Sequence, residues 1–426
     1  MKISILIPTR DRSEFLKYAL ATCVRIDHDI EIVVSDNASE DATRDVVSSF
    51  GDNRIKYVNT GTRVSQRLNF ENVIGNSTGE YVFMIGDDDG ILGSSLNYFA
   101  GILEREKPDV LSVPSIFYRW PSPNVVGSGR LKINKSQVYG KEEFINSSTY
   151  LSMVENFSYP KIDPGPKVYH GFSSRKLLDR LKHKTGWYIA SGQIDMYFAT
   201  ASLAFMERYM YVRHPASILA MGPKSGGLSV AEQHMSGGSR NNTADAVALE
   251  ALSDPVKDPI DGKMPILLMY LLNGVEQGNR CAFDGKLKID YEVYIKKIVD
   301  GLRKIPHSEM LRGRGQIQQF LNSISREELS YLLSGLSTSN GAVAEGRQQR
   351  FSRVSNYVTP HKVALNLSAY QGNVLAAVEA ADYLLGLNSN SLPGNFVGWM
   401  GLASRGLEYM IKDKFGIRPN WGSLAV

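Results

Sequence analysis

Residues 81–90, YVFMIGDDDG, decide the fold of this chain. The first five residues are aromatic or aliphatic and predict a buried strand. Asp87, Asp88 and Asp89 then leave the strand at its carboxyl end, where open α/β sheets bind their ligands. Adjacent carboxylates repel one another unless a cation shares their charge, and Mg²⁺ or Mn²⁺ takes oxygen ligands of this kind. The alternative is a solvated acidic turn before Gly90, and the preceding sequence distinguishes the two.

Length and charge limit the classes of function. The 426 residues are enough for two or three domains. The formal net charge of +4 is too small to indicate a nucleic-acid partner. Two cysteines far apart in the chain favour a reducing compartment over a disulfide framework. No signal peptide or apolar run of about 20 residues is evident. We therefore expect a cytoplasmic protein without a transmembrane segment, and peripheral membrane association stays open.

Strands and helices alternate up to the acidic triplet. The expected strands are residues 3–7, 30–35, 55–58 and 81–85, and the expected helices run from Ser13 to Cys23, from Glu40 onward, and from 68 to 74. Each strand is a short apolar run, and each helix has apolar residues at helical spacing. This order predicts an α/β fold with a largely parallel sheet covered on both faces.

Polar residues follow three of these strands. Parallel strands end at one edge of the sheet, so we expect Pro8, Thr9, Asp36 and the triplet at residues 87–89 to share a crevice. A nucleotide diphosphate suits this set: Asp36 accepts a hydrogen bond from the base, the loop at Thr9 packs against the base, and the triplet holds a metal on the diphosphate. An Asx turn leading into the second helix is the alternative for Asp36.

Three ordered motifs resemble those of family 2 glycosyltransferases with the GT-A fold. They are residues 5–10 (ILIPTR), 31–39 (EIVVSDNAS) and 78–89 (TGEYVFMIGDDD). The resemblance covers roughly the first 225 residues and is strongest over roughly the first hundred. It implies a GT-A type, mostly parallel sheet flanked by helices, as in nucleotide-diphospho-sugar transferases. It also implies transfer of a sugar, by family habit from a UDP-sugar, to a hydroxyl of a glycan or lipid-linked acceptor in polysaccharide biosynthesis.

The resemblance implies roles for single residues. Asp36 matches the family's uracil-contacting carboxylate, and Asp89 matches its direct ligand to Mn²⁺ or Mg²⁺. Asn69 lies where the family has its donor-side helix, although an ordinary surface amide is the alternative. Many members carry an acidic residue where this chain has Gly86, so the division of labour within the triplet stays open. The implied nucleotide-sugar contacts are Pro8, Thr9, Arg10, Asp36, Asn69, Asp87 and Asp88, and the implied metal ligands are Asp89 and Asp87.

An inverting transfer also needs a carboxylate that takes the proton of the acceptor hydroxyl. Asp195 is our candidate because it follows a glycine turn and opens an apolar helix, as in family members. The alternative for Asp195 is that its charge only stabilises the N-terminus of the helix through the helix dipole. Asp163 is the second candidate for the base. His170 is expected to line the acceptor pocket or to be a structural histidine. A basic loop rich in Gly and Ser follows, in which His214 is expected at the metal and Lys224 at the diphosphate, and a mobile linker is an equally good explanation of the same glycines.

The rest of the chain is expected to be a separate unit. Residues 229–262 are polar and small, and prolines stand at 255, 259 and 265, which predicts a linker. Apolar residues at helical spacing then predict a mainly α-helical accessory domain at 263–426, without recognisable chemistry. The glycosyltransferase domain is expected at 1–228, with nucleotide-sugar binding at 1–100 and the acceptor side at 101–228.

Three other functions were compared with this hypothesis. A dinucleotide-dependent dehydrogenase needs a Gly-rich turn after the first strand, where this chain has Pro8 to Arg12. A sugar nucleotidyltransferase needs a glycine-rich triphosphate loop at the same place, which this chain lacks, and it stays open as a minor enzyme alternative. A catalytically inactive nucleotide-sugar-binding module with a helical interaction domain stays open as an alternative.

Overall fold

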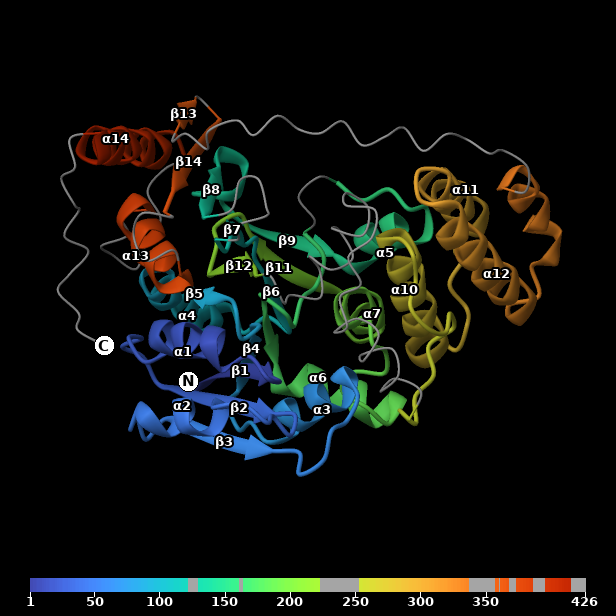
Figure 1. Ribbon diagram of the computed structural model, residues 1–426, viewed down its shortest axis with the longest axis horizontal. Helices are drawn as coiled ribbons and strands as arrows, with labels where there is room; N and C mark the ends of the chain where they lie inside the picture. Colours follow the sequence, from blue (N-terminus) through green and yellow to red (C-terminus); the bar gives the residue numbers. More distant parts are fainter. Residues whose placement is uncertain are drawn as a thin grey trace.

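The fold is built from two β-sheets and the helices that cover them (Figure 1). The structure is a computed structural model. It describes residues 1–121, 129–160, 164–222, 253–336, 357–359, 361–367, 373–385 and 395–414.

The larger sheet has eight strands, and its first four in spatial order are parallel to one another. The order is β3 (Ile55–Asn59), β2 (Ile30–Asp36), β1 (Ile3–Thr9), β4 (Tyr81–Met84), β10 (Phe172–Ser174), β6 (Val110–Ser112), β11 (Arg208–Val212) and β9 (Glu142–Asn146). Both β10 and β9 run antiparallel to their neighbours. The central strands β1, β2 and β4 are apolar and buried on both faces, as parallel strands under two helix layers require.

The smaller sheet has six strands and includes the end of the acidic turn. Its order is β13 (Tyr357–Thr359), β14 (Lys362–Asn366), β8 (Arg130–Asn134), β7 (Ile116–Arg119), β12 (Ser217–Met221) and β5 (Gly90–Ile91). Strand β14 pairs antiparallel with β8, so the C-terminal part of the chain completes a sheet that starts beside the triplet.

Seven α-helices belong to the described chain before residue 223. They are α1 (Ser13–Cys23), α2 (Thr43–Ser49), α3 (Gln66–Gly75), α4 (Gly93–Glu106), α5 (Ser147–Glu155), α6 (Arg175–Thr185) and α7 (Ile194–Ala201), with the 3₁₀ turns η1 (Lys135–Gln137) and η2 (Ser202–Phe205). Helix α3 begins at Ser65, whose hydroxyl accepts a hydrogen bond from the N–H of Leu68. The turn between α3 and β4 packs tightly on β1: a Cβ at Gly79 would lie 2.7 Å from the backbone nitrogen of Ser4.

The C-terminal helices divide into two groups (Figure 1). One group is α10 (Leu267–Phe283), α11 (Tyr291–Leu302), α12 (His307–Ser323) and the 3₁₀ segment η3 (Glu327–Leu336), and the other is α13 (Val374–Leu385) and α14 (Asn395–Lys414). The first group shares one hydrophobic core with α3, α6 and α7. The second lies at the opposite end of the molecule, where α13 packs on α1 and β5.

The predicted α/β class with a mainly helical C-terminal region is confirmed. The expected boundaries need correction, however, because residues 263–426 do not form one separate domain in the described chain. Arg25, just after the end of α1, pairs with Glu379 of α13 at 2.7 Å. Of the expected linker, the described residues 253–262 pack on the first part of the chain, with Asp254 only 3% exposed.

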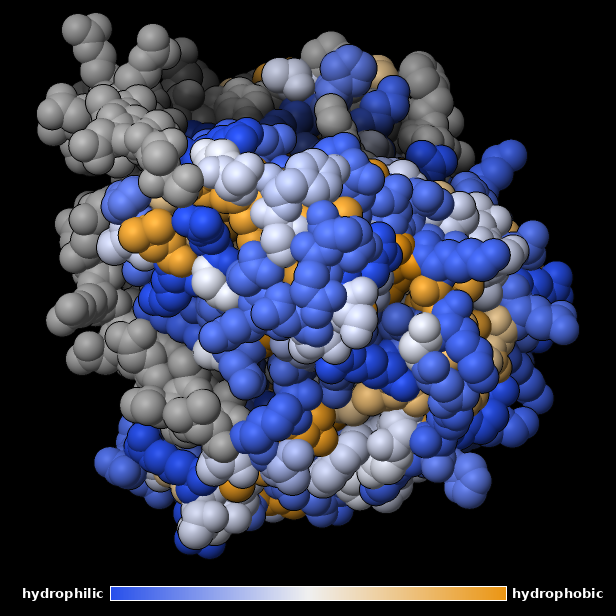
Figure 2. Space-filling view, turned by 90° about the vertical axis from the view of Figure 1, so that its right-hand side faces the viewer, coloured by the Kyte–Doolittle hydropathy of each residue, from blue (hydrophilic) through white to orange (hydrophobic). Residues whose placement is uncertain are grey.

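Among the described helices, none combines the length and apolarity that crossing a bilayer requires. The end of the molecule at α11 and α12 is largely hydrophilic, with scattered apolar spots (Figure 2).

Candidate functional site

The predicted crevice forms where β1, β2 and β4 end. Thr9 and Asp36 are register partners at the ends of β1 and β2. The Thr9 hydroxyl donates a hydrogen bond to Oδ2 of Asp87, 2.7 Å away. The structure therefore brings together the three strand ends that the sequence pointed to, with the triplet in the turn between β4 and β5.

Arg12 neutralises two members of the triplet. Its Nη1 lies 3.0 Å from Oδ1 of Asp87, and its Nη2 lies 2.7 Å from Oδ2 of Asp88. Burial raises the pKa of both carboxyls, that of Asp88 to about 7, and Arg12 opposes this shift. The Trp120 indole donates to the backbone carbonyl of Asp88 at 3.0 Å. The triplet is therefore a paired, buried cluster and no solvated turn.

Asp89 is surrounded by donors. Its Oδ2 accepts hydrogen bonds from the N–H of Gly86 at 2.7 Å and the hydroxyl of Tyr169 at 2.9 Å, and Nε2 of His170 lies 3.1 Å away. Its Oδ1 accepts from the N–H of Ala220 at 2.7 Å. Burial opposes ionisation, but His170 and the backbone donors hold the pKa of Asp89 below its ordinary value.

This arrangement does not fit a divalent metal. The oxygens of Asp89 already face four donors, and Arg12 holds an oxygen of each of the other two carboxylates. Within the described residues, no three His, Cys, Asp or Glu side chains are grouped so as to hold an ion. The donor atoms have the right chemistry, but they are committed to protein partners.

His214 does not take part in this cluster, so its expected role as a metal ligand is wrong in this structure. It is fully buried among Tyr98, Phe99 and Tyr139. Its Nδ1 accepts from the N–H of Tyr139 and its Nε2 contacts the hydroxyl of Ser95, both at 3.3 Å. Burial lowers its pKa to about 3, which identifies a neutral core histidine.

Asp36 is held firmly at the end of β2. Its Oδ1 accepts from the N–H of Ser39 at 2.9 Å, which is the Asx turn expected as the alternative. Its Oδ2 accepts from the Tyr57 hydroxyl at 2.6 Å and from Nδ2 of Asn59 at 3.0 Å. Asp36 is 2% exposed, so a nucleotide base can reach its carboxylate only alongside Tyr57 and Asn59.

Asn69 is a structural residue and no surface amide. Its Oδ1 accepts from the Ser35 hydroxyl at 2.6 Å, and its Nδ2 donates to the carbonyls of Ser35 at 3.2 Å and Thr9 at 3.4 Å. It thereby ties the ends of β1 and β2 together. Pro8 and Arg10, on the same edge, are partly exposed.

The acceptor-side candidate Asp195 is exposed in the first turn of α7. It interacts electrostatically with Tyr169, whose pKa is raised mainly by burial, then by Asp89 and Asp88, with a smaller contribution from Asp195. Tyr169 in turn donates its hydroxyl to Asp89, which links the surroundings of Asp195 to the cluster. Asp163 and Lys224 lie outside the described residues.

The sequence assigned no role in the cluster to four of its residues: Arg12, Trp120, Tyr169 and His170. Arg12 stands two residues after the motif at residues 5–10, in the loop that follows the first strand, and this position was the available signal. His170 was expected to line the acceptor pocket or to be structural. No pattern in the sequence pointed to Trp120 or Tyr169, which come from loops.

The comparisons identify the first part of the chain. The model of the family described as "Glycosyl transferase family 2" matches residues 4–153. These residues form a family 2 glycosyltransferase domain. One similar protein is the GalNAc(5)-diNAcBac-PP-undecaprenol beta-1,3-glucosyltransferase of Campylobacter jejuni, which is 35% identical over 100 residues, or 22% of this chain and 32% of the relative. Another is the abequosyltransferase RfbV of Salmonella typhimurium, 32% identical over 112 residues, or 25% of this chain and 34% of the relative.

The glycosyltransferase domain also has solved structural neighbours. Residues 1–349 of S. aureus TarS, in complex with UDP-GlcNAc, align with a TM-score of 0.45 and 15% identity over 79% of this chain and 91% of that chain. The curated relatives are matched over about a third of their length or less.

Proposed function

We propose that the protein is a glycosyltransferase that moves a sugar from a nucleotide-diphosphate sugar to a hydroxyl of a glycan or lipid-linked acceptor. The observation that carries this proposal is the meeting of Thr9, Asp36 and the acidic triplet at the strand ends of a family 2 domain. The names of two relatives, a glucosyltransferase acting on an undecaprenol-linked glycan and an abequosyltransferase, support the same reaction class.

The donor site in this proposal is the crevice itself. Asp36 accepts a hydrogen bond from the base, which favours uridine, and Pro8, Thr9 and Arg10 line the base and ribose. Asp87 and Asp88 face the donor together with Arg12, the cation that pairs with both. Lys224 is proposed at the diphosphate, which its positive charge would favour.

The chemistry proposed is an inverting transfer. The acceptor oxygen bonds to the anomeric carbon while the bond from that carbon to the diphosphate oxygen breaks, and Asp195 takes the hydroxyl proton. Its exposure in the first turn of α7 suits this role, because the helix N-terminus and water both favour the ionised form.

Dependence on Mn²⁺ or Mg²⁺ remains a hypothesis from the family resemblance. The committed oxygens of the triplet do not favour it, and no step above uses a metal. Both cysteines are free, which suits a reducing compartment, and we propose a cytoplasmic location.

A thermal-shift screen of nucleotide diphosphates and nucleotide sugars, with and without Mn²⁺, tests the donor class. A ligand at about 100 times its Kd stabilises the folded protein by about 2.7 kcal/mol. The proposal expects a rise in Tm with at least one nucleotide sugar, and a panel without any shift would contradict it.

A nucleotide-sugar-binding module without catalysis is the second candidate, and the internal pairing of the triplet favours it. It predicts the same thermal shift but no transfer to any acceptor, so an acceptor-product assay by mass spectrometry separates the two functions.

A further inference from the structure

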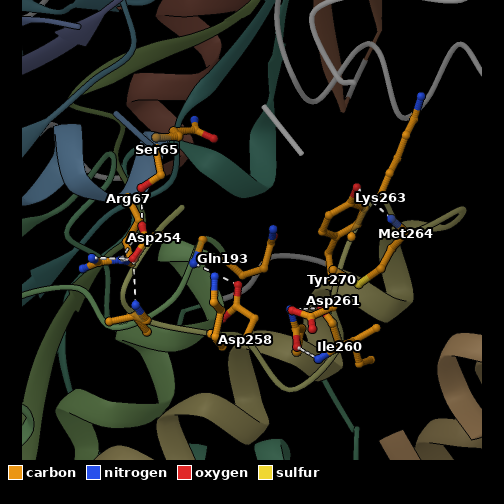
Figure 3. Close-up of a pocket in the computed structure, with 16 residues that line it drawn as sticks. Ser65, Arg67, Gln193, Asp254, Asp258, Ile260, Asp261, Lys263, Met264 and Tyr270 are labelled. Carbon is orange, nitrogen blue, oxygen red and sulfur yellow. Dashed lines mark hydrogen bonds and ion pairs between the residues drawn. The ribbon is translucent and has the colours of Figure 1, made fainter. Parts of the chain in front are cut away.

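A pocket lies next to the turn that precedes Asp195, the proposed proton acceptor. It is enclosed between the glycosyltransferase domain and the first C-terminal helices. Its cavity volume is about 130 Å³. The walls are the start of α3, the turn before α7, residues 254–264 and the start of α10 (Figure 3). The pocket is therefore completed by a part of the chain that lies outside residues 4–153.

The walls are fixed by buried contacts that need no ligand. Arg67 and Asp254 form an ion pair of 2.7 Å in which both side chains are 3% exposed. Arg67 also donates to the carbonyl of Ile189 at 2.9 Å. On the opposite wall, Asn273 bonds to both the N–H and the carbonyl of Ile260, at 2.7 and 3.3 Å. The pocket is thus preformed, as small-molecule sites usually are.

Asp258 stands at the centre of this pocket, next to Gln193 and between the Arg67–Asp254 pair and Tyr270 (Figure 3). Its Oδ2 accepts from the N–H of Gly192 at 3.1 Å. The Ser191 side chain also hydrogen-bonds to this carboxylate and opposes the rise of its pKa to about 6 that burial causes. Its Oδ1 is buried and has no hydrogen-bond partner of regular geometry among the described residues. A buried acceptor without a donor costs about 1–3 kcal/mol, so this atom favours a ligand that brings a hydroxyl or N–H group.

The other lining side chains match a sugar better than an apolar or strongly charged ligand. Gln66 and Gln193 carry amides, which both donate and accept, and Tyr270 adds an aromatic ring. Residues 257–263 contribute two lysines and two aspartates to the wall, so neither sign of charge dominates it.

The pocket is connected to the reaction centre through a short series of contacts. Gly192 and Gln193 line it and stand directly before the first turn of α7, which carries Asp195. Asp195 interacts with Tyr169, and Tyr169 bonds to Asp89. A ligand in the pocket is therefore on the Asp195 side of the acidic cluster.

We propose that this pocket binds the carbohydrate part of the acceptor, with Asp258 accepting a hydrogen bond from a sugar hydroxyl and Gln66 and Gln193 contacting its neighbours. The inference rests on the proposed function and adds the acceptor class and the residues that select it. It also explains why the segment after residue 253 packs so closely on the glycosyltransferase domain: it builds one wall of the acceptor site.

Saturation-transfer NMR on the full chain tests this proposal, with methyl β-glucoside and N-acetylglucosamine as probes and saturating uridine diphosphate present to fill the donor site. Asp258→Asn keeps the size of the side chain and replaces the unpaired oxygen by a donor. Gln66→Trp adds bulk at an exposed position on the pocket edge and leaves the buried walls intact. Asp179→Asn, at an exposed position on α6, is the matched control.

We expect a saturation-transfer signal for at least one probe in the wild type and the control, and a loss of at least fivefold in both pocket variants. Nucleotide diphosphate binding, measured separately by calorimetry, should stay within twofold in all four proteins. Absence of a signal in the wild type, or equal signals in the wild type and the pocket variants, would overturn the pocket assignment. Failure of the nucleotide titration alone would instead count against the proposed function.

Discussion

Replacement of Arg12 tests how the acidic triplet is stabilised. Arg12→Gln removes the guanidinium that lies 3.0 Å from Asp87 and 2.7 Å from Asp88. The side chains of these carboxylates are 3% and 6% exposed, so water does not replace the lost charge. Asp89 keeps its contacts with Tyr169 and His170, because neither depends on Arg12.

The size of the effect follows from the geometry. Unit charges about 4 Å apart attract by about 4 kcal/mol at an effective dielectric constant of about 20. Arg12 forms two such ion pairs, one with Asp87 and one with Asp88. Burial of the guanidinium offsets part of this attraction, and so does partial protonation of Asp88, whose pKa is about 7. Removing one partner of a buried ion pair typically costs about 3–5 kcal/mol, and we expect Arg12→Gln to lower the free energy of unfolding by that amount at pH 7.5.

Urea denaturation followed by circular dichroism measures this change. Arg63→Gln is the matched control, because Arg63 pairs with Asp11 and Glu40 on the surface, and its loss should cost less than about 1 kcal/mol. The double variant Arg12→Gln/Asp88→Asn removes one of the uncompensated charges and should recover about 1–2 kcal/mol. A loss below about 1 kcal/mol for Arg12→Gln, or no recovery in the double variant, would refute the ion-pair account.

Three further predictions concern a buried histidine, a glycine and the proposed base. The pKa of His214 in the folded protein is about 3, so the free energy of unfolding of the wild type should fall as the pH drops below about 6.5, where the unfolded histidine takes up a proton. In urea titrations, His214→Asn should reduce this fall by about 2 kcal/mol between pH 6.5 and 5. Parallel plots of stability against pH for the wild type and the variant would contradict the prediction. Gly79→Ala places a Cβ 2.7 Å from the backbone nitrogen of Ser4, so we expect a loss of about 2–3 kcal/mol in the same assay, and a change within about 0.5 kcal/mol would contradict the close packing of this turn. Asp195→Asn should reduce transfer to the acceptor by about 10²–10⁴-fold in a product assay while nucleotide binding is kept, and full activity would direct attention to Asp163.

The first half of the larger sheet was predictable from local patterns. Short apolar runs ended by Pro8, Asp36 and Gly86 predicted β1, β2 and β4 in their places, and parallel strands must end at one edge. The meeting of Thr9, Asp36 and the triplet followed from that geometry. The predicted role of Asp36 at a base remains a prediction, because the structure shows only its protein partners.

The second sheet was not predictable, because strand pairing between distant segments leaves no local signal. Strand β14 pairs with β8 across more than two hundred residues of chain, within a region for which the sequence predicts a mainly α-helical domain. The same limit explains the wrong role of His214: burial among three aromatic rings depends on tertiary packing, whereas its place in a basic loop was all that the sequence offered.

The partners of the triplet were missed for a related reason. Tyr169 and His170 reach Asp89 only because β10 inserts antiparallel between β4 and β6, which the alternating pattern of the first hundred residues did not include. Arg12 stands just after the first motif, but its pairing with Asp87 and Asp88 depends on how α1 starts. The sequence therefore identified the carboxylates and missed the groups that neutralise them.

Calorimetric titration of the full chain with uridine, guanosine and thymidine diphosphate, each with and without Mn²⁺, tests the central claim most directly. The account predicts saturable one-site binding of at least one of them, weakened at least tenfold by Asp36→Asn and unchanged by Asp179→Asn. No saturable binding of any of the three, or equal affinity in the wild type and the Asp36→Asn variant, would contradict it.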